Sequence, residues 1–263
     1  MLDEATRAAC LAKLQEEART DYLVNLLLPA YMRDAHLSLR AFHAEIAAIP
    51  FRVREAIAGQ IRLQWWREVL TRERDVEART NPAAAAILAY VDAVPDATAT
   101  LATKLDAHES DLYGDPPPDM NALEGYAGET RSILYQLLVR SSETDPDVAV
   151  DASGHAGVAE YMAETLANWP AMREQERGVV PRSLVGDGGH GDEALVRRWA
   201  ETCARHAHEA RKALPGELRG GAYRSLGLFA AIAAHGMRRP AKVASAGVPL
   251  SPLRRQWLVW RGP

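Results

Sequence analysis

The sequence predicts an all-α fold, a single domain over residues 1–263 that forms an antiparallel helical bundle. Apolar residues recur three and four positions apart along almost the whole chain, which is the spacing of one helix face. Alanine, the strongest helix former, is abundant, and no stretch alternates as a β-strand would. Long helical segments with short connections are typical of a bundle around one core.

The expected helices follow one another with few interruptions. The first four span residues 3–18, 21–32, 34–49 and 53–79. Asn81-Pro82 cannot continue a helix, so the next two are expected over residues 83–93 and 97–113. After three prolines at 116–118 come a helix over 121–140, a polar loop at 141–151 and a helix over 152–168. Glycines at 186–189 and Pro215-Gly216 then separate the last helices, over 192–213, 217–236 and 250–260.

The segment 60–70 is the most informative helix, because it carries two adjacent tryptophans among polar residues. At about 100° per residue, its apolar residues form two neighbouring rows. The rows are Ile57, Ile61, Trp65 and Val69, and Leu63, Trp66 and Leu70. So wide an apolar surface predicts an internal helix. Arg62, Gln64 and Arg67 are then expected at its border, where they either reach water or line a cavity.

Composition and charge exclude several classes of protein. The chain is 48% hydrophobic and 25% charged, as in an ordinary globular domain. Its formal charge of -4 gives no general attraction to nucleic acid or anionic lipid, although it is compatible with local basic patches. Cys10 and Cys203 are the only cysteines, so we expect a reducing compartment and no disulfide framework. We expect neither a transmembrane helix nor an intact signal or transit peptide.

Residues that could carry chemistry occur only in unspecific arrangements. No motif of nucleophilic catalysis is present. The metal-ligand candidates are Cys203, His206 and Glu209 on one turn, and the pairs Glu160/Glu164 and Glu17/Asp21 with the i, i+4 spacing of a magnesium clamp. Such spacings are common on solvated helix faces, which is how we interpret all three. The glycine-rich residues 186–191 are interpreted as a helix connection, and His155 as a packed or capping histidine.

A series of motifs covers most of the chain in a recognisable order. They are Asp21-Tyr22-Leu23, Ala41-Phe42-His43-Ala44-Glu45-Ile46-Ala47, Ile61-Arg62-Leu63-Gln64-Trp65-Trp66-Arg67-Glu68, Asp111-Leu112-Tyr113, Leu123-Glu124-Gly125-Tyr126-Ala127, Gly154-His155-Ala156-Gly157-Val158-Ala159 and Ser251-Pro252-Leu253-Arg254-Arg255-Gln256-Trp257. With them, the chain resembles the squalene and phytoene synthase family. More narrowly, it is similar to a divergent branch that includes mitochondrial complex I assembly factors and their bacterial relatives. The resemblance implies a helical bundle of the isoprenoid synthase type.

The resemblance also implies that both acid-rich magnesium segments of the active synthases are missing. The first falls on Ala47-Ala48-Ile49-Pro50-Phe51, which contains no acid. The second should precede a stretch that here corresponds to residues 176–181, which puts Asn168 and Met172 at the acid positions, with Pro170 between them. We therefore expect a pseudoenzyme with no catalytic residue, no bound metal and no cofactor.

The favoured function is a non-catalytic helper in the assembly of a respiratory complex, or an accessory subunit of one, with complex I the favoured complex. The expected partners are respiratory-complex subunits or assembly factors, and peripheral membrane contact is compatible with this role. The expected location is the mitochondrial matrix or the periphery of the inner membrane, or alternatively a bacterial cytoplasm. The candidate partner interface is Arg254, Arg255, Trp257 and Trp260, because Trp and Arg are enriched at interface hot spots. Alternatively, the two tryptophans pack the last helix onto the bundle.

Two other functions stay open. The first alternative is a prenyl-lipid-binding protein or a residual prenyl-diphosphate transferase that uses a central cavity. The candidate cavity residues are Tyr22, Arg62, Gln64, Trp65 and Tyr126. The second alternative is a permanent structural subunit of a large assembly.

Overall fold

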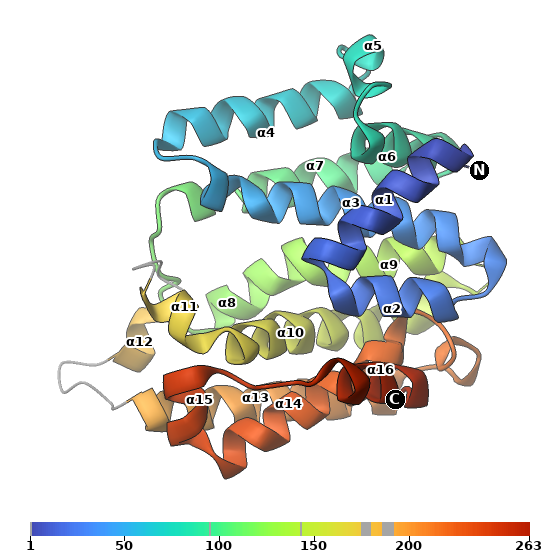
Figure 1. The fold of residues 1–263 in the computed structure, drawn as a ribbon. Coiled ribbons are helices and arrows are strands. Elements are labelled where there is room, and N and C mark those ends of the chain that lie inside the picture. Colours follow the sequence, from blue (N-terminus) through green and yellow to red (C-terminus); the bar gives the residue numbers. More distant parts are fainter. Residues whose placement is uncertain (1, 95, 143, 175–179, 186–191) are drawn as a thin grey trace. The chain divides into compact units, whose positions relative to one another are not determined.

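The computed structural model describes residues 2–94, 96–142, 144–174, 180–185 and 192–263 (Figure 1). Over these ranges the secondary structure is helical and contains no strand, so the all-α prediction is confirmed. The chain divides into two compact units, one of Met1–Tyr113 with Leu137–Asp145 and one of Gly114–Gln136 with Pro146–Pro263. A single domain over residues 1–263 stays a prediction. Within the ranges described, no helix has both the length and the apolar character needed to cross a bilayer.

The first unit is built from the N-terminal helices. They are α1 (Glu4–Glu17), α2 (Arg19–Leu27), α3 (Ala30–Arg52), α4 (Ala56–Leu70), α5 (Asp75–Ala78), α6 (Pro82–Ala93), α7 (Ala97–Ala107) and the 3-10 turn η1 (Ser110–Leu112). Asn81 and Pro82 separate two helices, as predicted, and they begin α6, because the Asn81 side chain accepts a hydrogen bond from the Ala84 amide and proline fits the first helical turn. The expected helix over 53–79 is interrupted where Arg72 adopts a positive φ of 70°.

Helix α4 buries one of its two apolar rows and only the C-terminal end of the other, where Val69 is fully buried. Trp66 is buried and meets Phe42 of α3 edge-to-face, with ring centroids 5.2 Å apart. Ile57 and Ile61 are instead 61% and 65% exposed. The prediction of an internal helix is therefore wrong: the row that Trp66 shares with Leu63 and Leu70 is wide enough to anchor α4 on the core.

The second unit is built from the remaining helices. They are α8 (Met120–Ala127), the π-helical turn η2 (Gly128–Ser132), the start of α9 (Ile133–Arg140), η3 (Pro146–Ala149), α10 (Val150–Ala167), α11 (Trp169–Glu174), α12 (Arg182–Val185), α13 (Asp192–Ala213), η4 (Gly216–Leu218), η5 (Ala222–Ser225), α14 (Leu226–Arg238), α15 (Pro240–Ala246) and α16 (Pro252–Arg261). Helices α10, α13 and α14 pack against one another and form its core. Residues 217–236, expected as one helix, form two short turns before α14, because Gly220-Gly221 interrupts them.

Gly157 allows α10 to approach η2 closely. A Cβ atom at this position would lie 2.3 Å from the backbone nitrogen of Ser132, whereas at Gly154, on the same helix, it would meet nothing within 4 Å. We expect Gly157→Ala to lower the free energy of unfolding by about 1–3 kcal/mol, the usual cost of overpacking. Gly154→Ala is the matched control and should be neutral or slightly stabilising, because alanine favours the helix. Chemical denaturation of both variants measures the difference, and equal stabilities would contradict the close approach.

Candidate functional site

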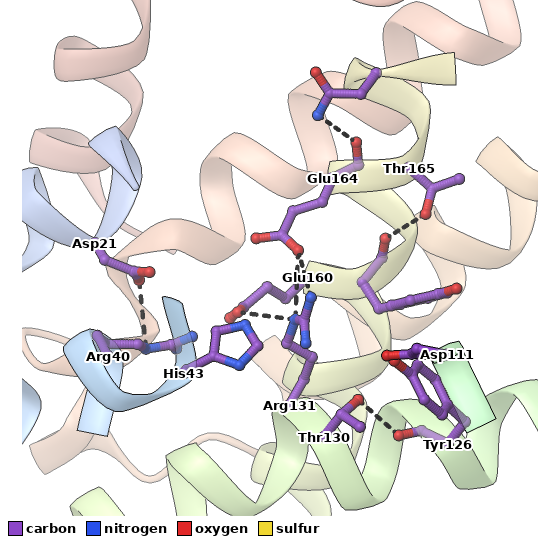
Figure 2. Close-up of polar contacts among 12 residues, drawn as sticks. Asp21, Arg40, His43, Asp111, Tyr126, Thr130, Arg131, Glu160, Glu164 and Thr165 are labelled. Carbon is purple, nitrogen blue, oxygen red and sulfur yellow. Dashed lines mark hydrogen bonds and ion pairs between the residues drawn. The ribbon is translucent and has the colours of Figure 1, made fainter. Parts of the chain in front are cut away.

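A buried arginine lies between the two glutamates that have magnesium-clamp spacing. Arg131 comes from the π-helical turn η2, and Glu160 and Glu164 lie one turn apart on α10 (Figure 2). Arg131 Nη2 is 3.1 Å from Glu164 Oε2, and Arg131 Nε is 3.7 Å from Glu160 Oε1. The Tyr135 hydroxyl also donates to Glu160. The carboxylates thus share a positive charge supplied by the protein itself.

Burial makes this arrangement a fixed ion pair. The side chains of Arg131 and Glu160 are 10% and 5% exposed, while Glu164 is half exposed. Burial alone would lower the pKa of Arg131, but the charges of Glu164 and Glu160 outweigh it and raise that pKa, so the guanidinium stays charged. The interpretation of Glu160 and Glu164 as a solvated face is therefore wrong for Glu160, which α10 turns into the core.

The other acidic pair does not converge on one site. Glu17 lies 2.9 Å from Lys13 and 3.0 Å from Arg52, whereas Asp21 lies 3.4 Å from the buried Arg40 (Figure 2). In the described parts of the chain, no three histidine, cysteine or acidic side chains are grouped as metal ligands.

The two segments expected at the positions of the magnesium motifs contain no acid. Ala47, Ala48 and Phe51 lie on the last turns of α3, where Phe51 is 54% exposed. Asn168 ends α10 and Pro170 falls in the first turn of α11, so the helix stops where the second motif would lie. Residues 176–179 and 186–191, including the glycine-rich connection, lie outside the described ranges. Neither Ala47–Phe51 nor Asn168 and Met172 supply a carboxylate that could bind magnesium.

A second buried polar cluster lies in the first unit. The Lys104 side chain is fully buried on α7, with Nζ 2.8 Å from His43 Nδ1 on α3 and 3.0 Å from His108 Nε2. His108 Nδ1 in turn lies 2.7 Å from Asp111 Oδ2. When the Lys104 amino group donates to both facing nitrogens, these nitrogens are acceptors and His108 Nδ1 is left to donate to Asp111. The cluster orders the A-F-H and D-L-Y motifs relative to each other.

His36 makes the first unit sensitive to acid. Burial, and then the nearby Arg40, hold its pKa well below the ordinary value of 6.5. Below pH 6.5 the unfolded chain therefore binds more protons at this position than the folded protein does. The free energy of unfolding is highest above pH 6.5 and falls as the pH drops toward the folded pKa. We expect a loss of at most about 1.4 kcal/mol per pH unit from this group. The free energy of unfolding is measured against pH for both variants and the unaltered chain. We expect a smaller slope for His36→Gln and an unchanged slope for His208→Gln, because His208 is exposed. Identical slopes in both variants would refute the role of His36.

The metal-ligand candidates Cys203, His206 and Glu209 do not lie together on a solvated face of α13. Cys203 is buried on α13, and its thiol, whose pKa burial raises, points at the Ala159 carbonyl oxygen. His206 is also buried, with Nδ1 2.9 Å from His155 Nδ1 and Nε2 3.1 Å from Glu124 Oε1. The interpretation of His155 as a packed histidine is confirmed.

The predicted cavity residues lie on α2 and α4 of the first unit and on α8 of the second. Tyr22 is half-buried on α2 under the Arg19 guanidinium, and Tyr126 is half-buried on α8 against Tyr161. On α4, Arg62 and Gln64 are exposed, and Trp65 is half-buried and donates to Glu77. Gln64 and Trp65 border one shallow surface recess, together with Gln60, Arg67 and Arg74. Arg67, expected at the same border, pairs with Asp106 and Glu109. The role of these five residues in a cavity stays a prediction.

The predicted partner interface lies on α16. Arg254 is exposed and Arg255 half-buried, and Trp257 and Trp260 are 50% and 64% exposed. Leu258 and Val259 are buried instead and attach the helix to α14. The alternative that the tryptophans pack the last helix onto the bundle is therefore wrong.

Substitutions on the two faces of α16 should differ in cost. We expect Trp257→Ser with Trp260→Ser to change the free energy of unfolding by less than about 0.5 kcal/mol, as is usual for surface residues. Leu258→Ala should cost about 2 kcal/mol, because it leaves a cavity under the helix. Urea denaturation compares the two, and the reverse order would show that the tryptophans anchor α16.

The sequence pattern did not reveal the buried charged residues. Lys104 stands between Leu101 and Leu105 in the sequence, and both leucines are fully buried. A lysine on an apolar helix face is the one feature of the sequence that could have indicated its burial. Arg131 has no such signal, because its orientation depends on the extra residue of a π-helical turn.

Comparison with known sequences matches residues 14–261 to the model of the squalene/phytoene synthase family. Proteins named NADH dehydrogenase (ubiquinone) complex I, assembly factor 6 are 28% identical in Bos taurus and 27% in Homo sapiens, over 192 residues. A Drosophila melanogaster homolog is 23% identical over 201 residues. Each match covers 72% of this chain, which spans only 57–58% of the length of these relatives.

A solved structure shares the fold. The crystal structure of a dehydrosqualene synthase in complex with ligand superposes with a TM-score of 0.76 at 16% identity, over 98% of this chain and 95% of that one. The isoprenoid synthase type of all-α fold is thereby confirmed.

Proposed function

This chain belongs to the squalene/phytoene synthase family, and we propose that it is a non-catalytic member that assists the assembly of respiratory complex I. One observation carries the proposal: Arg131 occupies the space between the carboxylates of Glu160 and Glu164, while the positions of both magnesium motifs hold no acid. Magnesium needs carboxylate oxygens that are free to coordinate it, and without the metal the departing diphosphate has no counter-charge.

The names of the related proteins support the proposed assembly role. Proteins named as complex I assembly factor 6 match this chain over most of its length, whereas its likeness to the dehydrosqualene synthase concerns the fold alone. A fold serves many tasks, so the name of the relatives favours assembly over synthesis. The proposed partners are complex I subunits or other assembly factors, in the mitochondrial matrix, at the inner-membrane periphery or in a bacterial cytoplasm.

An enzyme assay tests the non-catalytic part of the proposal. The full chain is incubated with farnesyl or geranylgeranyl diphosphate and magnesium, beside an active dehydrosqualene synthase. We expect diphosphate release from the synthase only. Release by this chain above the rate without protein would overturn the proposal.

Purification from cells tests the assembly part. We expect complex I subunits or assembly factors to co-purify with the tagged full chain in less than one-to-one amounts. A stable stoichiometric complex would instead indicate a permanent subunit. A prenyl lipid retained in native mass spectrometry, without any protein partner, would indicate the lipid-binding alternative.

A further inference from the structure

Positive charge is concentrated in the last part of the chain. Glu217 is the final acidic residue, and residues 218–263 contain eight basic residues: Arg219, Arg224, Arg238, Arg239, Lys242, Arg254, Arg255 and Arg261. The chain has 31 lysines and arginines and 35 acidic residues, so residues 1–217 hold the other 23 basic residues and all 35 acidic ones. The C-terminal segment therefore carries a net charge of +8 and the remainder -12, although the whole chain is only mildly acidic.

The fold gathers several of these charges in one place. His235, near the end of α14, has its pKa lowered by burial and then by the positive charges of Arg239, Arg254, Lys242 and Arg238. Helix α14 packs against both α15 and α16, so the basic residues of these helices lie around the end of α14. Arg238, Arg239, Lys242 and Arg254 are all exposed.

Helix α16 adds an apolar row to this basic surface. Leu253, Trp257 and Trp260 stand at i, i+4 and i+7, so they share one helix face, and they are 79%, 50% and 64% exposed. The guanidinium of Arg261 lies over the Trp257 ring, 5.3 Å from its centroid. The helix therefore presents an outward apolar row edged by arginines.

The opposite side of α16 holds the helix firmly in place. Leu258 and Val259 are buried, and the Trp260 carbonyl oxygen accepts a hydrogen bond from Arg224 at 2.9 Å. A Cβ atom at Gly227 of α14 would lie 2.4 Å from the Gly262 carbonyl oxygen, so the two backbones are in close contact. The exposed tryptophans are thus fixed to a folded unit and do not belong to a loose tail.

We propose that α16 and the basic residues around it, Arg238, Arg239, Lys242, Arg254 and Arg261, form a docking surface for an anionic lipid bilayer. Leu253, Trp257 and Trp260 enter the interface between headgroups and acyl chains, where tryptophan is favoured, and the basic side chains meet the lipid phosphates. The occupant is an anionic bilayer because its surface charge is negative throughout. The C-terminal segment is complementary to it, since residues 218–263 carry basic residues and no acid. This proposal is independent of the assembly role, since vesicle binding needs no complex I.

Vesicle co-sedimentation with the full chain tests the proposal. The probes are vesicles of phosphatidylcholine alone and of phosphatidylcholine mixed with phosphatidylglycerol. We expect binding to the mixed vesicles only, weakened by added salt because the attraction is screened. Arg254→Gln and Arg261→Gln should each weaken binding about fivefold, the usual contribution of one basic residue at an anionic surface. Trp257→Ser with Trp260→Ser should weaken it at least about tenfold.

The matched control removes exposed apolar residues elsewhere. Tyr31 and Val76 are 67% and 81% exposed in the first unit, and Tyr31→Ser with Val76→Ser should bind vesicles as the unaltered chain does. Should a tryptophan variant fail to fold, phosphatidylglycerol with brominated acyl chains tests the unaltered chain, whose tryptophan fluorescence it should quench. Equal binding to both kinds of vesicle, undiminished binding by a folded tryptophan variant, or no quenching overturns the proposal. So does loss of a protein partner in the α16 variants while vesicle binding persists, which would make α16 a protein interface.

Discussion

Arg131→Met is expected to lower the free energy of unfolding by about 3–5 kcal/mol. The substitution keeps an unbranched apolar side chain but removes the positive charge beside the buried Glu160 carboxylate, and breaking a buried pair on one side has this cost. Urea denaturation followed by circular dichroism measures the change.

A double variant separates charge from packing. Adding Glu160→Gln to Arg131→Met removes the negative charge as well, so the double variant should be more stable than Arg131→Met alone. Arg173→Met is the surface control, because Arg173 pairs with Asp192 at 3.2 Å while both side chains are 43% exposed, and it should change stability by less than about 1 kcal/mol. A similarly small effect of Arg131→Met would mean that the arginine does not neutralise the carboxylates.

Lys104→Met is the second substitution with a large expected effect, a loss of about 2–3 kcal/mol. Methionine fills most of the space of the lysine stem, so the cost comes from removing the donor that His43 Nδ1 and His108 Nε2 share in the interior. The same denaturation experiment measures it, with Lys212→Met as control, because the Lys212 side chain is 72% exposed and should be replaceable at almost no cost. Equal stability of the two variants would show that the buried cluster contributes nothing to folding.

Local patterns in the sequence were sufficient for most of the fold. The apolar period predicted α13 at residues 192–213 and placed α1, α6 and α10 within two residues, because these helices bury one regular face. It did not distinguish which row of α4 faces the core, since Ile57 and Ile61 are as apolar as Leu63 and differ only in tertiary context. Short helices such as α15 were missed, because seven residues contain too few turns for a period to appear.

The contacts within the candidate sites could not be predicted from the spacing of residues in the sequence. The i, i+4 spacing of Glu160 and Glu164 was visible, but the arginine between them comes from 29 and 33 positions earlier in the chain, on an irregular turn. The sequence left open whether Trp257 and Trp260 face a partner or pack onto the bundle. They are exposed because Leu258 and Val259 occupy the inner face of the helix instead. The overall charge of -4 concealed the basic C-terminal segment, because opposite charges in the two parts of the chain nearly cancel.

The amount of fully assembled complex I in the native host tests the central claim most directly. It is measured on native gels from cells that lack this chain and from the same cells with the chain restored, with another respiratory complex as internal control. The proposed role predicts that assembled complex I falls when the chain is absent, recovers when it is restored, and changes independently of the control complex. An unchanged amount of complex I in cells without the chain would contradict the role proposed here.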